Sequence, residues 1–162
     1  MHTWSGGHAV LHVDFSPALN LLASAEQDGA VRLWDPRAAT AAGAVGGLTT
    51  APRGTLKASD AWCVRARWAP AAVDLPHVLA SVGYDGAVKF WDIRSAKPLH
   101  AVKTTSERLM GLDWVPVSDD FVEQRAASAS AATGAATVKA YALAGGTGRV
   151  LDRVAWTLPV HE

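Results

Sequence analysis

The chain has 162 residues and a mass of 17.0 kDa, which is room for one domain or a piece of a larger one. Fifteen Lys and Arg balance fifteen Asp and Glu, which excludes a broadly basic nucleic-acid clamp as the default interpretation. The chain is 49% hydrophobic, so its composition is that of a folded protein, and no apolar run is long enough to span a membrane. The single cysteine, Cys63, excludes an internal disulfide framework. With no signal-peptide pattern at the start, we expect an intracellular protein that is not secreted.

One segment of the sequence occurs twice. The run LLASAEQDGAVRLWDPR at Leu21–Arg37 returns without a gap as VLASVGYDGAVKFWDIR at Val78–Arg94. A third copy follows with weaker likeness, in LDWVP at Leu112–Pro116 and TVKAY at Thr137–Tyr141. The repeat length of about 45–55 residues is typical of propeller blades.

Each unit predicts short antiparallel strands. The Asp28-Gly29 and Asp85-Gly86 pairs are hairpin signals, because glycine accepts the positive φ that such turns need. Pro98–Lys103 and Thr55–Lys57 are expected to be the fourth strands, after a surface loop at Ala38–Arg53 in the first unit. In the third unit, Ala127–Ser130 is expected to be the second strand and Thr137–Tyr141 the third. The predicted bounds of the units are about 7–58, 59–104 and 105–143, with a tail at 144–162.

These features resemble the WD-repeat family, which forms the blades of β-propellers. The likeness rests on the Trp34-Asp35 and Trp91-Asp92 pairs, the Asp-Gly turns and a Gly7-His8 pair. The resemblance implies an all-β fold of about three four-stranded antiparallel blades. Because propellers typically have four to eight blades, three would form an incomplete ring if alone.

The family's blades are held by a hydrogen-bonded network of His, Ser or Thr, Asp and Trp, since a buried indole N–H needs an acceptor. By position, the resemblance assigns this network to Ser24, Asp28 and Trp34 in the first unit and to Ser81, Asp85 and Trp91 in the second. The histidine is replaced by Ser59 in the second unit and by Thr105 in the third, so the network is incomplete.

Within the family the chain is similar to the C-terminal blades of a ribosome-biogenesis factor that works with Pescadillo and the block-of-proliferation protein. The shared motifs lie at Arg32–Arg37, Trp62–Pro70, Ser81–Leu99 and Leu109–Trp114. This likeness implies a non-catalytic scaffold for large-subunit assembly and ribosomal RNA maturation in the nucleolus. It implies those two proteins as partners and a pre-ribosomal RNA contact within a complex, with no membrane and no small-molecule substrate.

The candidate partner-binding residues are those placed by the repeat beside the blade turns: Gln27, Trp62, Tyr84 and Arg108. Exposed Trp and Tyr beside Arg have the chemistry of interaction hot spots. Packing between blades is the alternative role for Trp62.

The sequence contains no motif of catalysis, metal binding or cofactor binding, so we expect no enzyme, no metal and no cofactor. Cys63 is expected to be buried filler. Two alternatives to ribosome assembly remain open. The W-D-x-R boxes ending at Arg37 and Arg94 resemble those with which substrate receptors dock on cullin-type ubiquitin ligases. The blades also resemble those of a peroxisomal import receptor.

Overall fold

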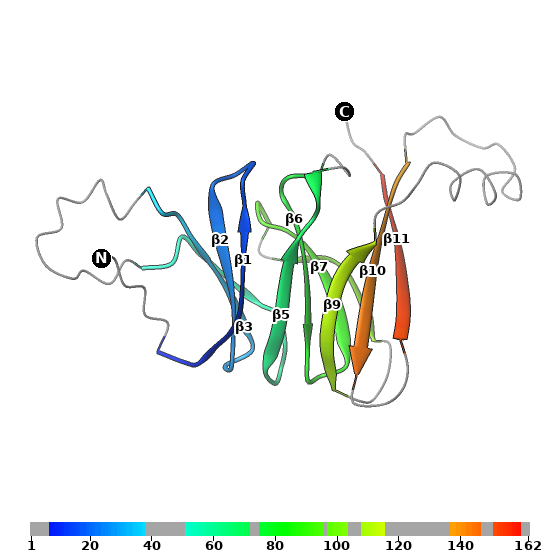
Figure 1. Ribbon diagram of the computed structural model, residues 1–162, viewed down its shortest axis with the longest axis horizontal. Helices are drawn as coiled ribbons and strands as arrows, with labels where there is room; N and C mark the ends of the chain where they lie inside the picture. Colours follow the sequence, from blue (N-terminus) through cyan, green and yellow to red (C-terminus); the bar gives the residue numbers. More distant parts are fainter. Residues whose placement is uncertain are drawn as a thin grey trace, which may run out of the picture.

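The computed structural model describes residues 7–37, 51–71, 75–95, 97–103, 108–115, 137–146 and 151–159. These residues form three antiparallel β-sheets that stand side by side (Figure 1). Within the part of the chain that is described, no helix is long and apolar enough to cross a membrane.

The first two sheets have four strands each, in the order of the sequence. The first sheet contains β1 (Val10–Ser16), β2 (Leu21–Glu26), β3 (Ala30–Trp34) and β4 (Gly54–Lys57). The second contains β5 (Cys63–Trp68), β6 (Val78–Gly83), β7 (Ala87–Asp92) and β8 (Pro98–Lys103). The all-β fold of antiparallel blades is thus confirmed.

Both predicted Asp-Gly pairs close hairpins. Gly29 has φ 82° and Gly86 has φ 73°, in the left-handed region that favours glycine. The aspartate before each glycine accepts a hydrogen bond from the backbone N–H two residues on, at 3.0 Å from Ala30 and 3.2 Å from Ala87. The repeated sequence therefore makes the same turn twice.

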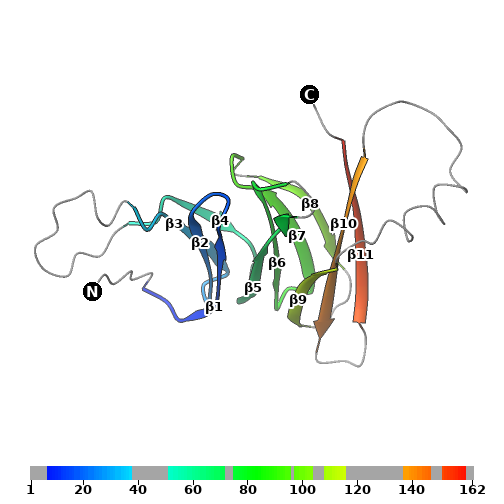
Figure 2. The same cartoon turned by 45° about the horizontal axis from the view of Figure 1, so that its top comes forward.

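The third sheet differs from the expectation. It contains β9 (Leu109–Val115), β10 (Thr137–Gly146) and β11 (Leu151–Pro159), in the order β11-β10-β9 (Figure 2). It therefore has three strands within the described residues, and β11 lies in the segment that we predicted to be a tail. The expected strand at Ala127–Ser130 lies outside the described residues.

The assignment of Thr137–Tyr141 as a third strand is also wrong in position. Tyr141 pairs with Val115 of β9, so β10 takes the place that the second strand has in the other sheets. The third unit has no Asp-Gly turn to fix the register, and β10 extends past Tyr141 to Gly146, where it pairs antiparallel with β11 as well as with β9.

The sheets are joined by apolar cores that lie between them. The first sheet contributes alternate residues of β2 and β3 to a core whose second side is Cys63, Ala66, Trp68, Leu79 and Trp91. The opposite face of the second sheet, with Phe90 at its centre, packs on Leu109, Leu112 and Trp114 of β9. Alternate residues of β6 and β7 therefore face opposite neighbours, which explains why both strands are mostly apolar.

Two equivalent tryptophans tie each sheet to the one before it. The indole N–H of Trp68 donates to the carbonyl of Asp14 at 3.3 Å, and that of Trp114 donates to the carbonyl of Arg67 at 3.2 Å. The same position in β1 is Phe15, which is 46% exposed, as are Leu11 at 40% and Val13 at 55% on its face of the strand. The strands β1, β5 and β9 consequently lie next to one another.

Within each of the first two sheets, a buried tryptophan is bonded to a buried serine. Trp34 Nε1 donates to Ser24 Oγ at 2.8 Å, and Trp91 Nε1 donates to Ser81 Oγ at 2.9 Å. All four side chains are almost fully buried, so these bonds replace water that the polar atoms lose on folding.

We expect Ser81→Ala to lower the free energy of unfolding by about 2 kcal/mol, because the buried Trp91 N–H loses its acceptor. The measurement is urea denaturation followed by circular dichroism. Ser95→Ala, at an exposed position, is the matched control and should cost less than about 0.5 kcal/mol. Equal costs for the two variants would contradict this role of Ser81.

Candidate interaction surface

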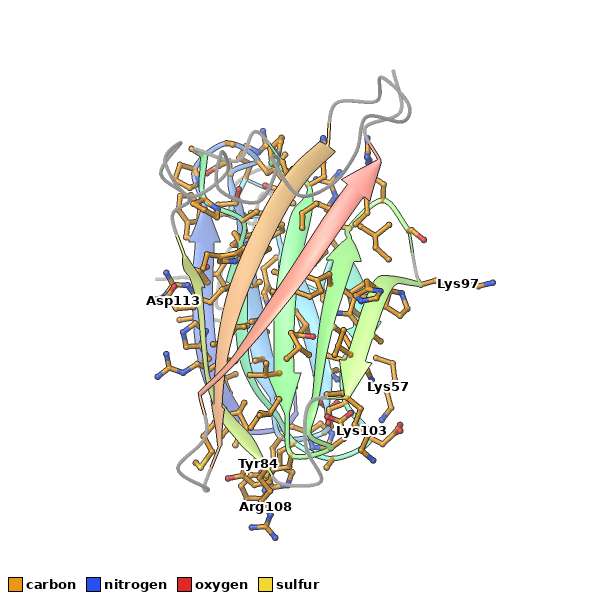
Figure 3. The ribbon with its side chains drawn as sticks, turned by 90° about the vertical axis from the view of Figure 1, so that its right-hand side faces the viewer. Lys57, Tyr84, Lys97, Lys103, Arg108 and Asp113 are labelled. Atoms are coloured by element: carbon orange, nitrogen blue, oxygen red, sulfur yellow. The ribbon has the colours of Figure 1, made fainter. Side chains whose placement is uncertain are left out.

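Three of the predicted partner-binding residues form one stack at the turn end of the sheets. Trp62 lies just before β5, Tyr84 in the turn between β6 and β7, and Arg108 just before β9. The rings of Trp62 and Tyr84 are stacked, with centroids 5.3 Å apart and planes 17° apart. The Arg108 guanidinium carbon lies 5.1 Å from the centre of the Tyr84 ring. Figure 3 shows Tyr84 and Arg108 together at this end.

The backbone around the stack holds its rings in place. Tyr84 N–H donates to the carbonyl of Trp62 at 2.9 Å, which joins the turn to the start of β5. Gly83 has no room for a side chain, because a Cβ there would lie 2.6 Å from both the Ser59 hydroxyl and the Trp62 carbonyl. Close backbone contact at Gly83 thus brings Tyr84 against Trp62.

The stack lies on the surface. Trp62 is 40% exposed, Arg108 is exposed and Tyr84 is half-buried. Trp62 is not among the buried residues of either core between the sheets, and its alternative role in packing between blades stays a prediction. An arginine over stacked aromatic rings is ordered before any partner arrives, which limits the entropy lost on binding.

The fourth candidate, Gln27, lies apart from the stack. It takes the place of Tyr84 in the first sheet, where its backbone N–H donates to the carbonyl of Ala9 at 2.9 Å. Among the described residues, no contact joins its side chain to the three stacked ones.

The first sheet has a polar network that the sequence analysis missed. Ser24 Oγ, which accepts from Trp34, donates to the fully buried carboxylate of Glu26 at 2.9 Å. Arg32 then bridges Glu26 to Asp28, with one of its nitrogens 2.7 Å from Asp28 Oδ2. A charged hydrogen-bonded group thus links Asp28 to the tryptophan.

The second sheet has no such link. The position equivalent to Glu26 is Gly83, and Lys89 lies 3.5 Å from Asp85 without reaching Ser81. Ser59, at the expected place of the histidine, is fully buried and its hydroxyl accepts from Ala61 N–H at 3.1 Å. The two repeats have glutamate and glycine at this equivalent position. That difference is the sequence signal that could have pointed to a special role for Glu26.

Arg37 and Arg94 are each paired with the aspartate of their own Trp-Asp box. Arg37 Nε lies 3.0 Å from Asp35 Oδ1, and Arg94 Nε lies 2.9 Å from Asp92 Oδ1. Each arginine thus has an ion-pair partner within its own blade. Docking of Arg37 and Arg94 on a ligase adaptor remains a prediction.

A hollow of about 620 Å³ lies at the opposite end of the inner strands. Its walls carry Trp68 and Trp114, and its charged groups are Asp14, Arg67 and Asp113. Arg67 lies 3.5 Å from Asp14 and 3.3 Å from Asp113, so these charges largely satisfy one another. Within the described part of the chain, no three His, Cys, Asp or Glu side chains are placed to hold a metal ion.

The comparisons with known proteins agree with this geometry. The family model for the WD domain, G-beta repeat, matches residues 1–35. A chain in the crystal structure of the mitotic checkpoint complex superposes with a TM-score of 0.57 at 19% identity, over 85% of this chain and 31% of that one. Saccharomyces cerevisiae Sqt1 superposes with a TM-score of 0.58 at 12% identity, over 85% of this chain and 28% of that one. The three sheets therefore have the fold of β-propeller blades, and the first of them lies in the segment that matches the WD-repeat model.

Two curated proteins with similar sequences are named for ribosome biogenesis. The chain is 32% identical over 116 residues to the ribosome biogenesis protein WDR12 homolog of Chlamydomonas reinhardtii, covering 70% of this chain and 24% of the relative. It is 29% identical over 115 residues to the ribosome biogenesis protein YTM1 of Meyerozyma guilliermondii, covering 71% and 23%. The chain thus spans about a quarter of the length of these curated relatives.

The hydrogen bond from Arg32 holds the pKa of Asp28 below its ordinary value of 3.8. A lowered carboxyl pKa adds stability that is present above the ordinary pKa and is lost as the pH falls through the lowered one. We expect the stability of Asp28→Asn to fall less than that of the parent between about pH 5 and about pH 2. Asp60→Asn, at an exposed carboxylate outside any described ion pair, is the control and should keep the parental pH dependence. Urea midpoints measure both, and equal slopes for Asp28→Asn and the parent would contradict the pairing.

Burial raises the pKa of the Cys63 thiol to about 12. The reactive thiolate is therefore scarce in the folded chain, and we expect iodoacetamide at about pH 8 to modify Cys63 only once urea unfolds it. Mass spectrometry of the labelled chain measures this. Modification of the folded chain at the unfolded rate would contradict the burial of Cys63.

Proposed function

We propose that the chain is a non-catalytic scaffold in the assembly of the large ribosomal subunit and the maturation of its RNA. Support comes from its similarity, over about 70% of its length, to proteins named for ribosome biogenesis. Proteins of the Pescadillo and block-of-proliferation types are its proposed partners, and the nucleolus is its proposed location.

The observation that carries the proposal is the exposed stack of Trp62, Tyr84 and Arg108 on the turn end of the blades. Rings that are already stacked on rigid turns offer a large contact area at low cost in side-chain entropy. This geometry suits binding, because a preordered aromatic surface with a cation can contact a partner without rearranging its side chains.

Recovery of large-subunit precursors with the tagged chain tests the proposal. We expect Trp62→Ala to reduce the amount recovered several-fold, because hot-spot aromatic residues each contribute about 2 kcal/mol or more to binding. Lys97→Ala, an exposed substitution outside the stack, is the matched control and should leave recovery unchanged. If the unaltered chain recovers neither precursors nor assembly factors, the proposed function is wrong.

A further inference from the structure

The stack of Trp62, Tyr84 and Arg108 leaves part of its aromatic surface open to solvent. Tyr84 stacks on the Trp62 indole, and 40% of Trp62 remains exposed. The Arg108 guanidinium lies over the Tyr84 ring. A flat partner that continues this near-parallel stack would bury the indole without moving any of the three side chains.

Two lysines without an ion pair to any described residue lie at this end of the blades. Lys57 pairs in register with Ala30 and Lys103 with Ala87, which places both lysines beside the residues that follow the two turns. Figure 3 shows them at the same end as Tyr84 and Arg108. Neither lysine forms an ion pair with a described residue.

The acidic groups of this end are mostly neutralised from within. Glu26 and Asp28 are paired with Arg32, and Asp85 is paired with Lys89. Asp60 is the exposed carboxylate that no described cation contacts. Among the described residues of this end, the three cations Lys57, Lys103 and Arg108 outnumber the one carboxylate without an ion pair. The described surface therefore favours an anionic partner, although the whole chain is neutral.

We infer that this surface binds single-stranded RNA, with a base stacked on Trp62 and phosphates beside Lys57, Lys103 and Arg108. Single-strand binding combines aromatic platforms with a positive track for the backbone, and both are present here. An acidic protein segment would satisfy the cations, but its aspartate and glutamate side chains carry no aromatic ring to continue the stack. The inference deepens the proposed function, on which it rests, by naming the class of partner for the same surface.

Fluorescence anisotropy of the full chain with labelled oligouridylate and oligoadenylate of about twelve nucleotides tests the inference. We expect Trp62→Ala to weaken binding about tenfold, within the range measured for the loss of one base–aromatic stack. Trp62→Phe keeps an aromatic face and should retain most of the affinity. An unchanged thermal unfolding midpoint shows that Trp62→Ala is folded.

The salt dependence tests the cations separately. Each phosphate contact on a single strand contributes about −0.7 to the slope of log affinity against log salt concentration. The double variant Lys57→Ala/Lys103→Ala should therefore flatten the slope by about 1.4. Lys97→Ala removes an exposed lysine that no described carboxylate pairs with, and it should leave the slope unchanged.

Three results would overturn the inference. The first is equal RNA affinity for Trp62→Ala and the parent. The second is equal affinity for duplex and single-stranded RNA, since duplex bases are already stacked on each other. The third is tighter binding of a polyglutamate peptide of matched charge, which would indicate an acidic protein partner. Recovery of precursors by the tagged chain is scored independently, so RNA binding can fail while the proposed function holds, and the reverse.

Discussion

Buried indole N–H groups are the constraint on which the rest of this structure depends. Trp34 and Trp91 each bond to a serine inside a sheet, while Trp68 and Trp114 each bond to a carbonyl of the preceding sheet. The first pair fixes strand against strand and the second pair fixes blade against blade. Each bond is worth about 1 kcal/mol, but leaving the buried donor unpaired costs more, so these contacts select one arrangement.

The first two blades differ in the groups that surround the serine and the aspartate of their turn ends. In the first, Glu26 and Arg32 connect the serine to Asp28 through a charged chain of hydrogen bonds. In the second, Gly83 replaces the glutamate, and the space that it frees is filled by Ser59 and the backbone of Trp62. That replacement brings Tyr84 against Trp62, so the exposed stack depends on a missing side chain in the interior.

The sequence predicted the first two blades well because their Asp-Gly turns and Trp-Asp ends fix the register. The prediction of the third blade was wrong, because no Asp-Gly turn there shows which strand β10 pairs with. Trp62, Tyr84 and Arg108 could be proposed one by one from their places beside turns. Their stacking could not, because it depends on close contacts between segments about twenty residues apart, in which Gly83 and Tyr84 approach the Trp62 carbonyl. Glu26 was missed because a carboxylate next to a turn is normally expected to be exposed. Its burial depends on the hydrogen bonds to Arg32 and Ser24, which only the structure shows.

The most direct test of this account is hydrogen exchange of the indole N–H groups, measured by NMR with assignments from single Trp→Phe variants. The account predicts slow exchange for Trp34, Trp68, Trp91 and Trp114, which are buried and bonded, and fast exchange for the exposed Trp62. Exchange of Trp91 as fast as that of Trp62 would contradict it.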